Sequence, residues 1–423
     1  MYDPSFLPLG TRIGYYEHRD PFGIRQEDRR SHMWVIGGSG TGKTRFIQQA
    51  IQEDIQAGRG VGLIDPHGDL ALDILSAVSP ERVHDVVLID MTDTDWPVTL
   101  NVLHGAPTPD AVASTLVGAF KDYFEDSWGP RLEWCLYNSL GLLSSVQNTS
   151  LLGVRRLLVD EAYRAQLLRQ VQDPSILAYW RDEFPKNERD QREWTPSIQN
   201  KIGQFFASSL IRNCLGQPSG RINLRNVMDR RGIFIARIPK GVLGPAATSL
   251  FGSLLVSLFQ AAALQREDTP EEERIDFHLY VEEFQNFMSM SFAHALSEVR
   301  KYRLNLVLVN QYSKVLKPVI LDSILTNCGT IISFRVGSHD AELLAQEFAG
   351  HFPAPQFVNL ARRHILVRLL EHGVQRVPFE GETTDLRKAD FATIDLVRQH
   401  TRDHYARPRA EVERKIARFL MAD

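Results

Sequence analysis

One octapeptide near the start of the chain constrains the fold more than any other stretch: Gly37-Gly38-Ser39-Gly40-Thr41-Gly42-Lys43-Thr44. It fits the P-loop pattern G-x-x-x-x-G-K-[ST] at every fixed position. The apolar residues 33–36 before it predict a short buried strand, and residues 45–51 after it predict a helix. Strand, loop and helix in this order form the context in which the pattern holds phosphate groups.

The chemistry of this loop follows from its backbone. Glycines let successive N–H groups turn inward around phosphate oxygens, because no Cβ atom clashes there, and the helix N-terminus adds the positive end of its dipole. Lys43 is then expected to reach the β- and γ-phosphates, and the Thr44 hydroxyl to ligate Mg²⁺. The sequence therefore predicts a site for a nucleoside triphosphate.

Length and composition restrict the class of protein further. With 423 residues, 43% of them hydrophobic and 24% charged, the chain resembles a soluble globular protein of two or three domains. Its net charge of −4 gives no general attraction for nucleic acid, so such contacts must be local, as in a pore lining. Three scattered cysteines, Cys135, Cys214 and Cys328, argue against disulfides and a cysteine zinc site. With a start that lacks an apolar signal region, they predict a cytoplasmic protein.

One stretch is long and apolar enough to require a membrane test. Residues 242–264 carry no charge and could span a bilayer. They also contain Gly-Pro, serines and a threonine, and they stand between two strand-like runs. A buried crossover helix accounts for these features better, so we expect no integral membrane segment.

Apolar runs separated by helical patterns predict an α/β fold with a doubly wound, mostly parallel sheet. The expected strands are 33–36, 60–65, 86–90, 232–238, 277–281, 304–310 and 330–334, followed by a hairpin of 365–370 and 374–379. Residues 1–32 are polar and rich in arginine, and we expect them to wrap the edge of the sheet.

The middle of the chain has a different texture. Residues 132–143, 150–171, 174–184 and 198–215 have helical spacing, with no convincing strand among them. We therefore predict an ATPase-type domain in two parts, 1–105 and 229–385, an all-helical insertion domain at 106–228, and a polar helical tail at 386–423. In the tail, Val412, Ile416 and Leu420 recur at helical spacing.

Hydrolysis needs carboxylates as well as a P-loop. The apolar run 277–281 ends in Glu282 and Glu283, for which we predict roles on the Mg²⁺ shell and on the attacking water, respectively. Gln311 follows the next apolar run and is a candidate γ-phosphate sensor at the carboxyl edge of the sheet. Asp65 and Asp69 end another run and either support the metal or cap a turn.

Positive charges supply two further kinds of candidate. Arg300 and Arg335 flank predicted strands, and either can serve as an arginine finger across a subunit interface or form a surface salt bridge. Candidates for contacts with nucleic-acid phosphates are the basic residues at 300–303, Lys240, Arg398, Arg402, Arg407 and Arg409, although such groups are commonly just solvated.

Together these motifs resemble the HerA–FtsK superfamily of P-loop ATPases, and most closely the soluble relatives of type IV secretion coupling proteins. The segments that carry the resemblance are HMWVIG at 32–37, LIDPHGD at 63–69, YVEEFQNF at 280–287, LSEVRKY at 296–302, VNQ at 309–311 and ISFR at 332–335. The family's usual Asp-Glu pair is Glu282-Glu283 here, and the N-terminal transmembrane helices of many coupling proteins are absent.

The resemblance implies a RecA-like fold and a ring, usually a hexamer, that hydrolyses ATP with Mg²⁺ at subunit interfaces and moves DNA through its centre. It favours Arg300 over Arg335 as the finger. Conjugative or mobile-element DNA transfer is one expected role. A HerA-like motor that acts with a partner nuclease or effector in DNA processing or anti-phage defence is the second. A nucleotide-gated assembly platform with little turnover is the third, and the candidate hydrolytic set argues against it.

Overall fold

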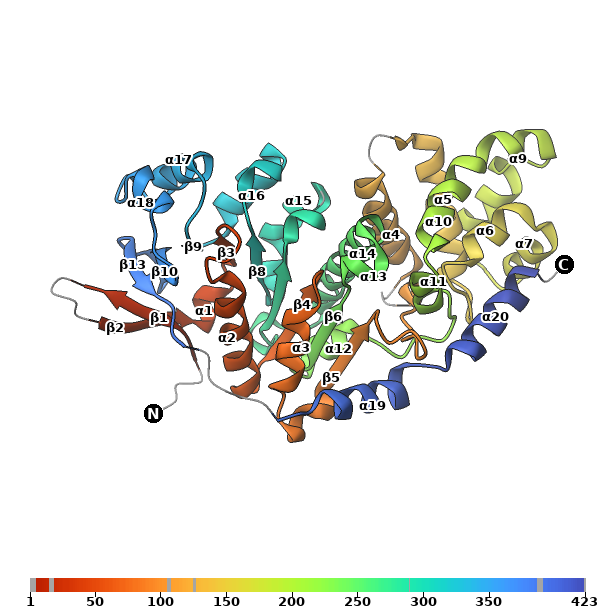
Figure 1. The fold of residues 1–423 in the computed structure, drawn as a ribbon. Helices are drawn as coiled ribbons and strands as arrows, with labels where there is room; N and C mark the ends of the chain where they lie inside the picture. Colours follow the sequence, from red (N-terminus) through yellow and green to blue (C-terminus); the bar gives the residue numbers. More distant parts are fainter. Residues whose placement is uncertain are drawn as a thin grey trace. The chain divides into compact units, whose positions relative to one another are not determined.

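The structure is a computed structural model that describes residues 5–14, 19–104, 108–124, 127–288, 290–385 and 391–421 (Figure 1). The chain forms two compact units. The first consists of Met1–Leu88, Asn226–Arg237 and Arg266–Arg398, and the second of Ile89–Arg225, Ile238–Gln265 and Gln399–Asp423. The predicted start without a signal region, at residues 1–4, lies outside the described residues.

A mixed sheet forms the framework of the first unit, and its described strands run in the order β2-β1-β13-β10-β9-β3-β8-β7-β4-β6-β5. The strands are β1 (Phe6–Ile13), β2 (Arg19–Arg25), β3 (Met33–Ile36), β4 (Gly60–Asp65), β5 (Val86–Asp90), β6 (Ile233–Arg237), β7 (Phe277–Glu282), β8 (Leu304–Asn310), β9 (Thr330–Ser333), β10 (His364–Arg368) and β13 (Phe379–Glu382). Those from β9 to β6 in this order pair in parallel. The seven apolar runs predicted between residues 33 and 334 each form a strand, and the mostly parallel sheet is confirmed.

The parallel strands are buried along their whole length, as their continuous apolar sequences require. Each of β3, β4, β7 and β8 is buried at every position. On one face, Val35 and Leu63 share a hydrophobic cluster with Ile47 and Ile51 of α2 (Lys43–Gln56) and Ile74 of α3 (Asp69–Ser76). This packing fixes the helix that starts at the P-loop against the sheet (Figure 1).

The N-terminal region extends the sheet and does not merely wrap its edge, so that expectation is corrected. Strands β1 and β2 pair with each other in antiparallel fashion, and β1 also pairs with β13. Leu7 and Leu9 alternate with more exposed positions, as do Phe22 and Ile24, and these four side chains are buried. The alternation of apolar and polar residues is the pattern of a half-buried antiparallel strand.

The predicted terminal hairpin of 365–370 and 374–379 is present with other bounds, because residues 376–378 interrupt its second strand. Strand β10 pairs in antiparallel fashion with both β9 and β13, and the chain between them forms a small two-stranded sheet of β11 (Leu370–Glu371) and β12 (Val374–Gln375). Other helices that lie wholly within the first unit are α1 (Gln26–Arg29), α15 (Met290–Val299), α16 (Pro318–Asn327), α17 (Ser338–Glu347) and α18 (Ala354–Val358).

The second unit is built mainly from helices. Its described β structure consists of the last two residues of β5 and an isolated bridge between Val98 and Ala406. Its helices are α4 (Pro109–Tyr123), α5 (Pro130–Ser144), α6 (Gly153–Val159), α7 (Glu161–Leu168), α8 (Pro174–Ala178), α9 (Glu188–Trp194), α10 (Pro196–Ala207), α11 (Ser209–Leu215), α13 (Lys240–Leu243), α14 (Pro245–Leu264) and α20 (Arg409–Met421). Two more, α12 (Leu224–Asp229) and α19 (Ile394–Tyr405), have residues in both units.

Helix breaks follow local capping chemistry. The span predicted at 150–171 is two helices, because the Asp160 side chain accepts a hydrogen bond from Tyr163 N and starts α7. Among the described helices, α14 with its short extension is long and apolar enough to cross a membrane by length and composition. However, 67% of its most apolar window is buried inside the protein, as expected for a core helix. In the tail, α20 buries Val412 and Ile416, while Leu420 is exposed.

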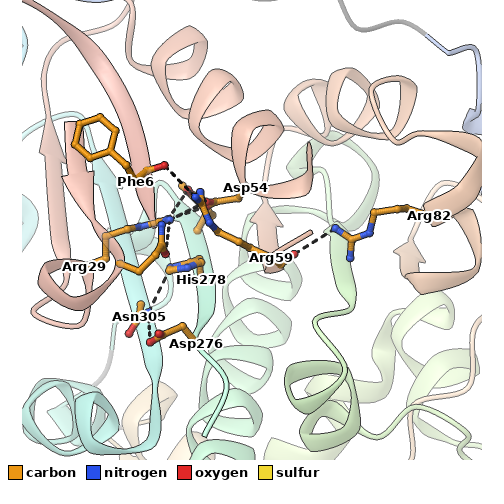
Figure 2. Close-up of polar contacts among 10 residues, drawn as sticks. Phe6, Arg29, Asp54, Arg59, Arg82, Asp276, His278 and Asn305 are labelled. Atoms are coloured by element: carbon orange, nitrogen blue, oxygen red, sulfur yellow. Dashed lines mark hydrogen bonds and ion pairs between the residues drawn. The ribbon is translucent and has the colours of Figure 1, made fainter. Parts of the chain in front are cut away.

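A buried ionic network links the P-loop helix to the central strand β7 (Figure 2). Asp54, near the end of α2, pairs with Arg29 at 2.7 Å and Arg59 at 2.8 Å, and accepts a 2.6 Å hydrogen bond from the Tyr280 hydroxyl. Burial alone would raise the pKa of Asp54, but Arg29 and the other cationic neighbours outweigh it and hold that pKa well below its usual range. The network therefore ties α2 to the strand that carries Glu282.

Candidate nucleotide-binding site

The P-loop connects β3 to α2, and three of its four glycines, Gly37, Gly40 and Gly42, lie where other residues would not fit. A Cβ atom on Gly37 would lie 2.5 Å from Cβ of Phe334. Gly40 and Gly42 have φ values of 73° and 122°, in the region that favours glycine. The Lys43 ammonium donates hydrogen bonds to the carbonyl oxygens of Gly37 and Gly38, the latter at 2.9 Å. The stretch thus forms a loop in which the Lys43 side chain folds back onto the carbonyl groups of Gly37 and Gly38.

Burial lowers the pKa of Lys43 to about 8, although the carboxylates of Glu282 and Glu283 act in the opposite direction. A buried ammonium gains most from a polyanionic ligand, because bound phosphates replace the stabilisation that water gives to an exposed ammonium. The electrostatics of Lys43 therefore suit a phosphate group.

Two oxygen groups suited to Mg²⁺ meet beside the loop. The Thr44 hydroxyl donates a 3.2 Å hydrogen bond to Oε1 of Glu282, the last residue of β7. Burial, followed by the negative charge of Asp65, raises the pKa of Glu282 to about 7. A divalent cation would favour the charged form of this carboxylate, and oxygen is the ligand atom that Mg²⁺ prefers. Thr44 and Glu282 thus fit a Mg²⁺ ion held directly or through water.

Glu283 lies at the same edge, with an unusual backbone. Its φ of 48° and ψ of 46° place it in the left-handed region, which costs a non-glycine residue on the order of 1 kcal/mol. Oε1 of Glu283 accepts a 2.5 Å hydrogen bond from Nε2 of Gln311 and lies 3.1 Å from Nε2 of His67. Gln311 also accepts a 3.2 Å hydrogen bond from the Ser39 hydroxyl, so its amide bridges the P-loop and Glu283.

The two aspartates after β4 are placed differently from each other. The Asp65 carboxylate is buried and accepts 2.8 Å hydrogen bonds from the N–H groups of His67, Gly68 and Ala71, which fixes the turn into α3. Asp69 is the exposed first residue of α3. Asp65 thus forms the turn and also adjoins Glu282, and a supporting role at the metal stays a prediction for both residues.

The two predicted finger residues lie outside the P-loop pocket of their own chain. Arg300 starts a short turn before β8, at the edge of the parallel strands opposite the P-loop, and it is exposed. Arg335 follows β9; its carbonyl accepts a 2.8 Å hydrogen bond from Gly38 N, and the residue is exposed. Action in trans stays a prediction for both.

The P-loop, Glu282, Glu283 and Gln311 surround one pocket of about 380 Å³ at the carboxyl edge of the sheet. Its lining residues are Ser39, Gly40, Gly42, Lys43, Thr44, Arg45, His67, Glu282, Glu283, Val309, Asn310, Gln311 and Arg362. The pocket therefore collects the P-loop, both predicted carboxylates and the predicted amide sensor in one place.

The sequence analysis gave no task to five of the lining residues, which are Arg45, His67, Val309, Asn310 and Arg362. Two of them, His67 and Arg362, carry polar side chains from segments outside the predicted phosphate loop and strand ends. Strand β10 runs antiparallel to β9, so the residues just before β10 come to the edge where the parallel strands end. Arg363 N donates to the Thr41 carbonyl at 3.3 Å, which places its neighbour Arg362 beside the P-loop. The predicted terminal hairpin could have indicated Arg362, because an antiparallel strand starts at the edge where the parallel strands end. The LIDPHGD segment could have indicated His67.

A mostly parallel sheet with a P-loop after one strand and acidic residues at the end of the next strand but one defines the RecA-like P-loop ATPase fold. Solved structures agree with this class. Plasmid coupling protein TrwB in complex with ADP and Mg²⁺ matches at a TM-score of 0.67 and 12% identity, over 92% of this chain and 97% of that chain.

Two further structures are similar in fold. TrwB with a non-hydrolysable ATP analogue matches at a TM-score of 0.66 and 13% identity, covering 90% of this chain and 94% of the other. VirB4 of Thermoanaerobacter pseudethanolicus matches at 0.63 and 14% identity, covering 91% and 98%. No protein-family model and no curated protein sequence matches this chain. At such identities the likeness establishes the fold.

Proposed function

We propose that this protein is an ATP hydrolase that uses Mg²⁺ and couples hydrolysis to DNA translocation in conjugative or mobile-element DNA transfer. The observation that carries the proposal is the convergence of Lys43, Thr44, Glu282, Glu283 and Gln311 on one pocket. Similar structures add support, because one TrwB structure contains ADP and Mg²⁺ and another is described as a bacterial conjugative coupling protein.

In this proposal each residue has one task. The P-loop N–H groups and Lys43 bind the phosphates, and Thr44 and Glu282 hold Mg²⁺, which neutralises charge on the phosphate oxygens when bound. Glu283 accepts a proton from the attacking water. The water oxygen bonds to the γ-phosphorus while the bond to the bridging oxygen breaks, so ADP and inorganic phosphate leave. Gln311 lies between Ser39 and Glu283, where it can contact the γ-phosphate and the base together.

We propose that the active form is a cytoplasmic ring without an integral membrane segment, with DNA in its lumen and six copies as the expected number. Arg300 or Arg335 would complete a neighbouring subunit's site, because an arginine that stabilises charge on the transferred phosphoryl group can come from another chain. The proposed division places the ATPase parts at 1–105 and 229–385, the helical insertion at 106–228 and the tail at 386–423.

The direct test of hydrolysis compares wild type with Glu283→Gln and Lys43→Ala. Wild type should release phosphate from ATP in the presence of Mg²⁺. Glu283→Gln should bind a fluorescent ATP analogue normally but lose at least about a hundredfold in turnover, and Lys43→Ala should lose binding. Full turnover in Glu283→Gln would contradict the assignment of Glu283, and absence of nucleotide binding in wild type would contradict the proposal itself.

A further inference from the structure

The carboxylate of Glu283 is contacted by side chains from three separate segments. Gln311, after β8, donates to Oε1 at 2.5 Å, and His67, after β4, lies 3.1 Å from the same oxygen. Asn286 donates to Oε2 at 3.3 Å. Contacts from several directions fix the rotation of a carboxylate, whose terminal torsion is otherwise soft.

The position of His67 is set by sheet register and a rigid turn. Strands β4 and β7 pair in parallel, with Ile64 opposite Val281, so the residues that follow Ile64 run beside Glu282 and Glu283. The buried Asp65 carboxylate then accepts the N–H of His67 itself at 2.8 Å. The His67 backbone is therefore fixed, while its side chain remains 49% exposed and faces the pocket.

This geometry matters because a general base must be correctly oriented when the water attacks. A misplacement of about 1 Å can reduce the rate about a hundredfold without any change in nucleotide binding. Glu283 also has a left-handed backbone, which its surroundings must stabilise. Nε2 of His67, 3.1 Å from Oε1, adds to the hydrogen bond from Gln311, and the two contacts together restrict the rotation of the carboxylate.

We propose that His67 is a positioning residue for Glu283. His67 and Gln311 both hold Oε1 of Glu283, and Gln311 also contacts Ser39 of the P-loop. His67 thereby acts on turnover and not on nucleotide affinity. The proposal rests on the proposed function, in which Glu283 takes the proton from water.

The kinetic test uses three variants of the full chain. His67→Ala removes the donor, whereas His67→Gln keeps an N–H group at a similar reach. His84→Ala is the matched control, because His84 is also exposed and lies 3.3 Å from a carboxylate, that of Asp85, outside the pocket. With Mg²⁺ and ATP, we expect His67→Ala to lower kcat about tenfold with KM changed less than about twofold. His67→Gln should stay within about threefold of wild type, and His84→Ala should equal it.

Three results would overturn the proposal. One is an unchanged kcat in His67→Ala. Another is a raised KM at constant kcat, which would make His67 a nucleotide contact. The third is an equal loss of kcat in His67→Gln and His67→Ala, which would mean that the substitutions disturb the turn after β4 and not a contact with Glu283.

A second measurement needs no catalysis. Thermal unfolding of the nucleotide-free protein is compared for His67→Ala, Glu283→Ala and the double variant. Contact between the two side chains predicts that the Tm shift of the double variant differs from the sum of the single shifts, and additive shifts would contradict the proposal. A wild type without turnover would count against the proposed function, while this cycle still decides whether His67 holds Glu283.

Discussion

The hydroxyl of Thr44 donates a 3.2 Å hydrogen bond to Oε1 of Glu282, across 238 positions of sequence. The contact joins the first turn of the P-loop helix to the end of β7. Between them lie the parallel pairs β3–β8 and β8–β7, which bring both strand ends to the same edge. The expected metal-binding pair is thus produced by the sheet order itself.

Thr44 should control the dependence of nucleotide binding on Mg²⁺. Thr44→Ala removes the hydroxyl that we assign to the metal, so the affinity for ATP with Mg²⁺ should fall about tenfold, while affinity in EDTA changes little. Thr44→Ser keeps the oxygen and should bind like wild type. Titration of a fluorescent ATP analogue with and without Mg²⁺ checks this, and equal losses in both conditions would contradict the metal role.

Arg362 should contribute to nucleotide affinity. It lines the pocket beside the P-loop, and a guanidinium there is attracted to a polyphosphate. We expect Arg362→Ala to raise KM for ATP about five- to tenfold with kcat nearly unchanged, and Arg362→Lys to recover part of the loss. Steady-state kinetics measure both values; an unchanged KM would remove Arg362 from the site.

Asp54 should be critical for folding stability. Asparagine at this position would leave Arg29 and Arg59 buried without their counter-charge, which costs roughly 3–5 kcal/mol in other proteins. The matched control is Asp182→Asn, which breaks the exposed ion pair with Arg181 and should leave stability unchanged within error. Urea unfolding gives both free energies, and equal effects would contradict the importance of the network.

Acid should weaken the fold at pH values above those at which most carboxylates titrate. Burial, with the nearby Arg29, lowers the pKa of His278 to about 3, and burial lowers that of His32 to about 4. Below pH of about 6.5 the unfolded chain binds protons that these two folded-state histidines do not. The free energy of unfolding should therefore fall as pH drops from about 6.5 toward 4, by about 1.4 kcal/mol per pH unit for each histidine.

Urea unfolding between pH 7.5 and 5 measures this dependence of the free energy of unfolding on pH. The interval covers roughly the range in which an exposed histidine titrates. His278→Leu should make the slope shallower by about 1.4 kcal/mol per pH unit, because one of the two histidine protons is lost. Glu282, whose pKa is raised to about 7, acts in the opposite direction to the same extent in both proteins, so it does not affect this difference. His84→Ala, at an exposed position, should leave the slope unchanged. A stability that is flat across this range would contradict the neutral, buried state of both histidines.

The central strands were predictable because strands buried on both faces have continuous apolar sequences, as in Leu304–Asn310. The P-loop was predictable because its backbone geometry demands particular residues at fixed spacing. Strands β1 and β2 were missed, since their alternating pattern contains proline, glycine and several arginines. The polar composition of residues 1–32 suggested a segment that wraps the edge of the sheet. Burial of one face was nevertheless enough for these residues to form strands.

Contacts between distant segments were harder to predict. His67 meets Glu283 only because β4 pairs with β7, and Arg362 reaches the P-loop only because β10 is antiparallel. The pairing of Arg29 with Asp54 was also hidden, because charged residues are normally exposed and their burial depends on the whole fold. Strand order and register, which one sequence does not specify, thus decide these details.

The most direct test of the account measures ATP turnover with and without linear duplex DNA, on particles sized by light scattering. Wild type should form particles of hexamer size whose turnover rises when DNA is added, and Glu283→Gln should abolish turnover in both conditions. A protein that stays monomeric at all concentrations and hydrolyses ATP without any response to DNA would contradict the translocase proposal.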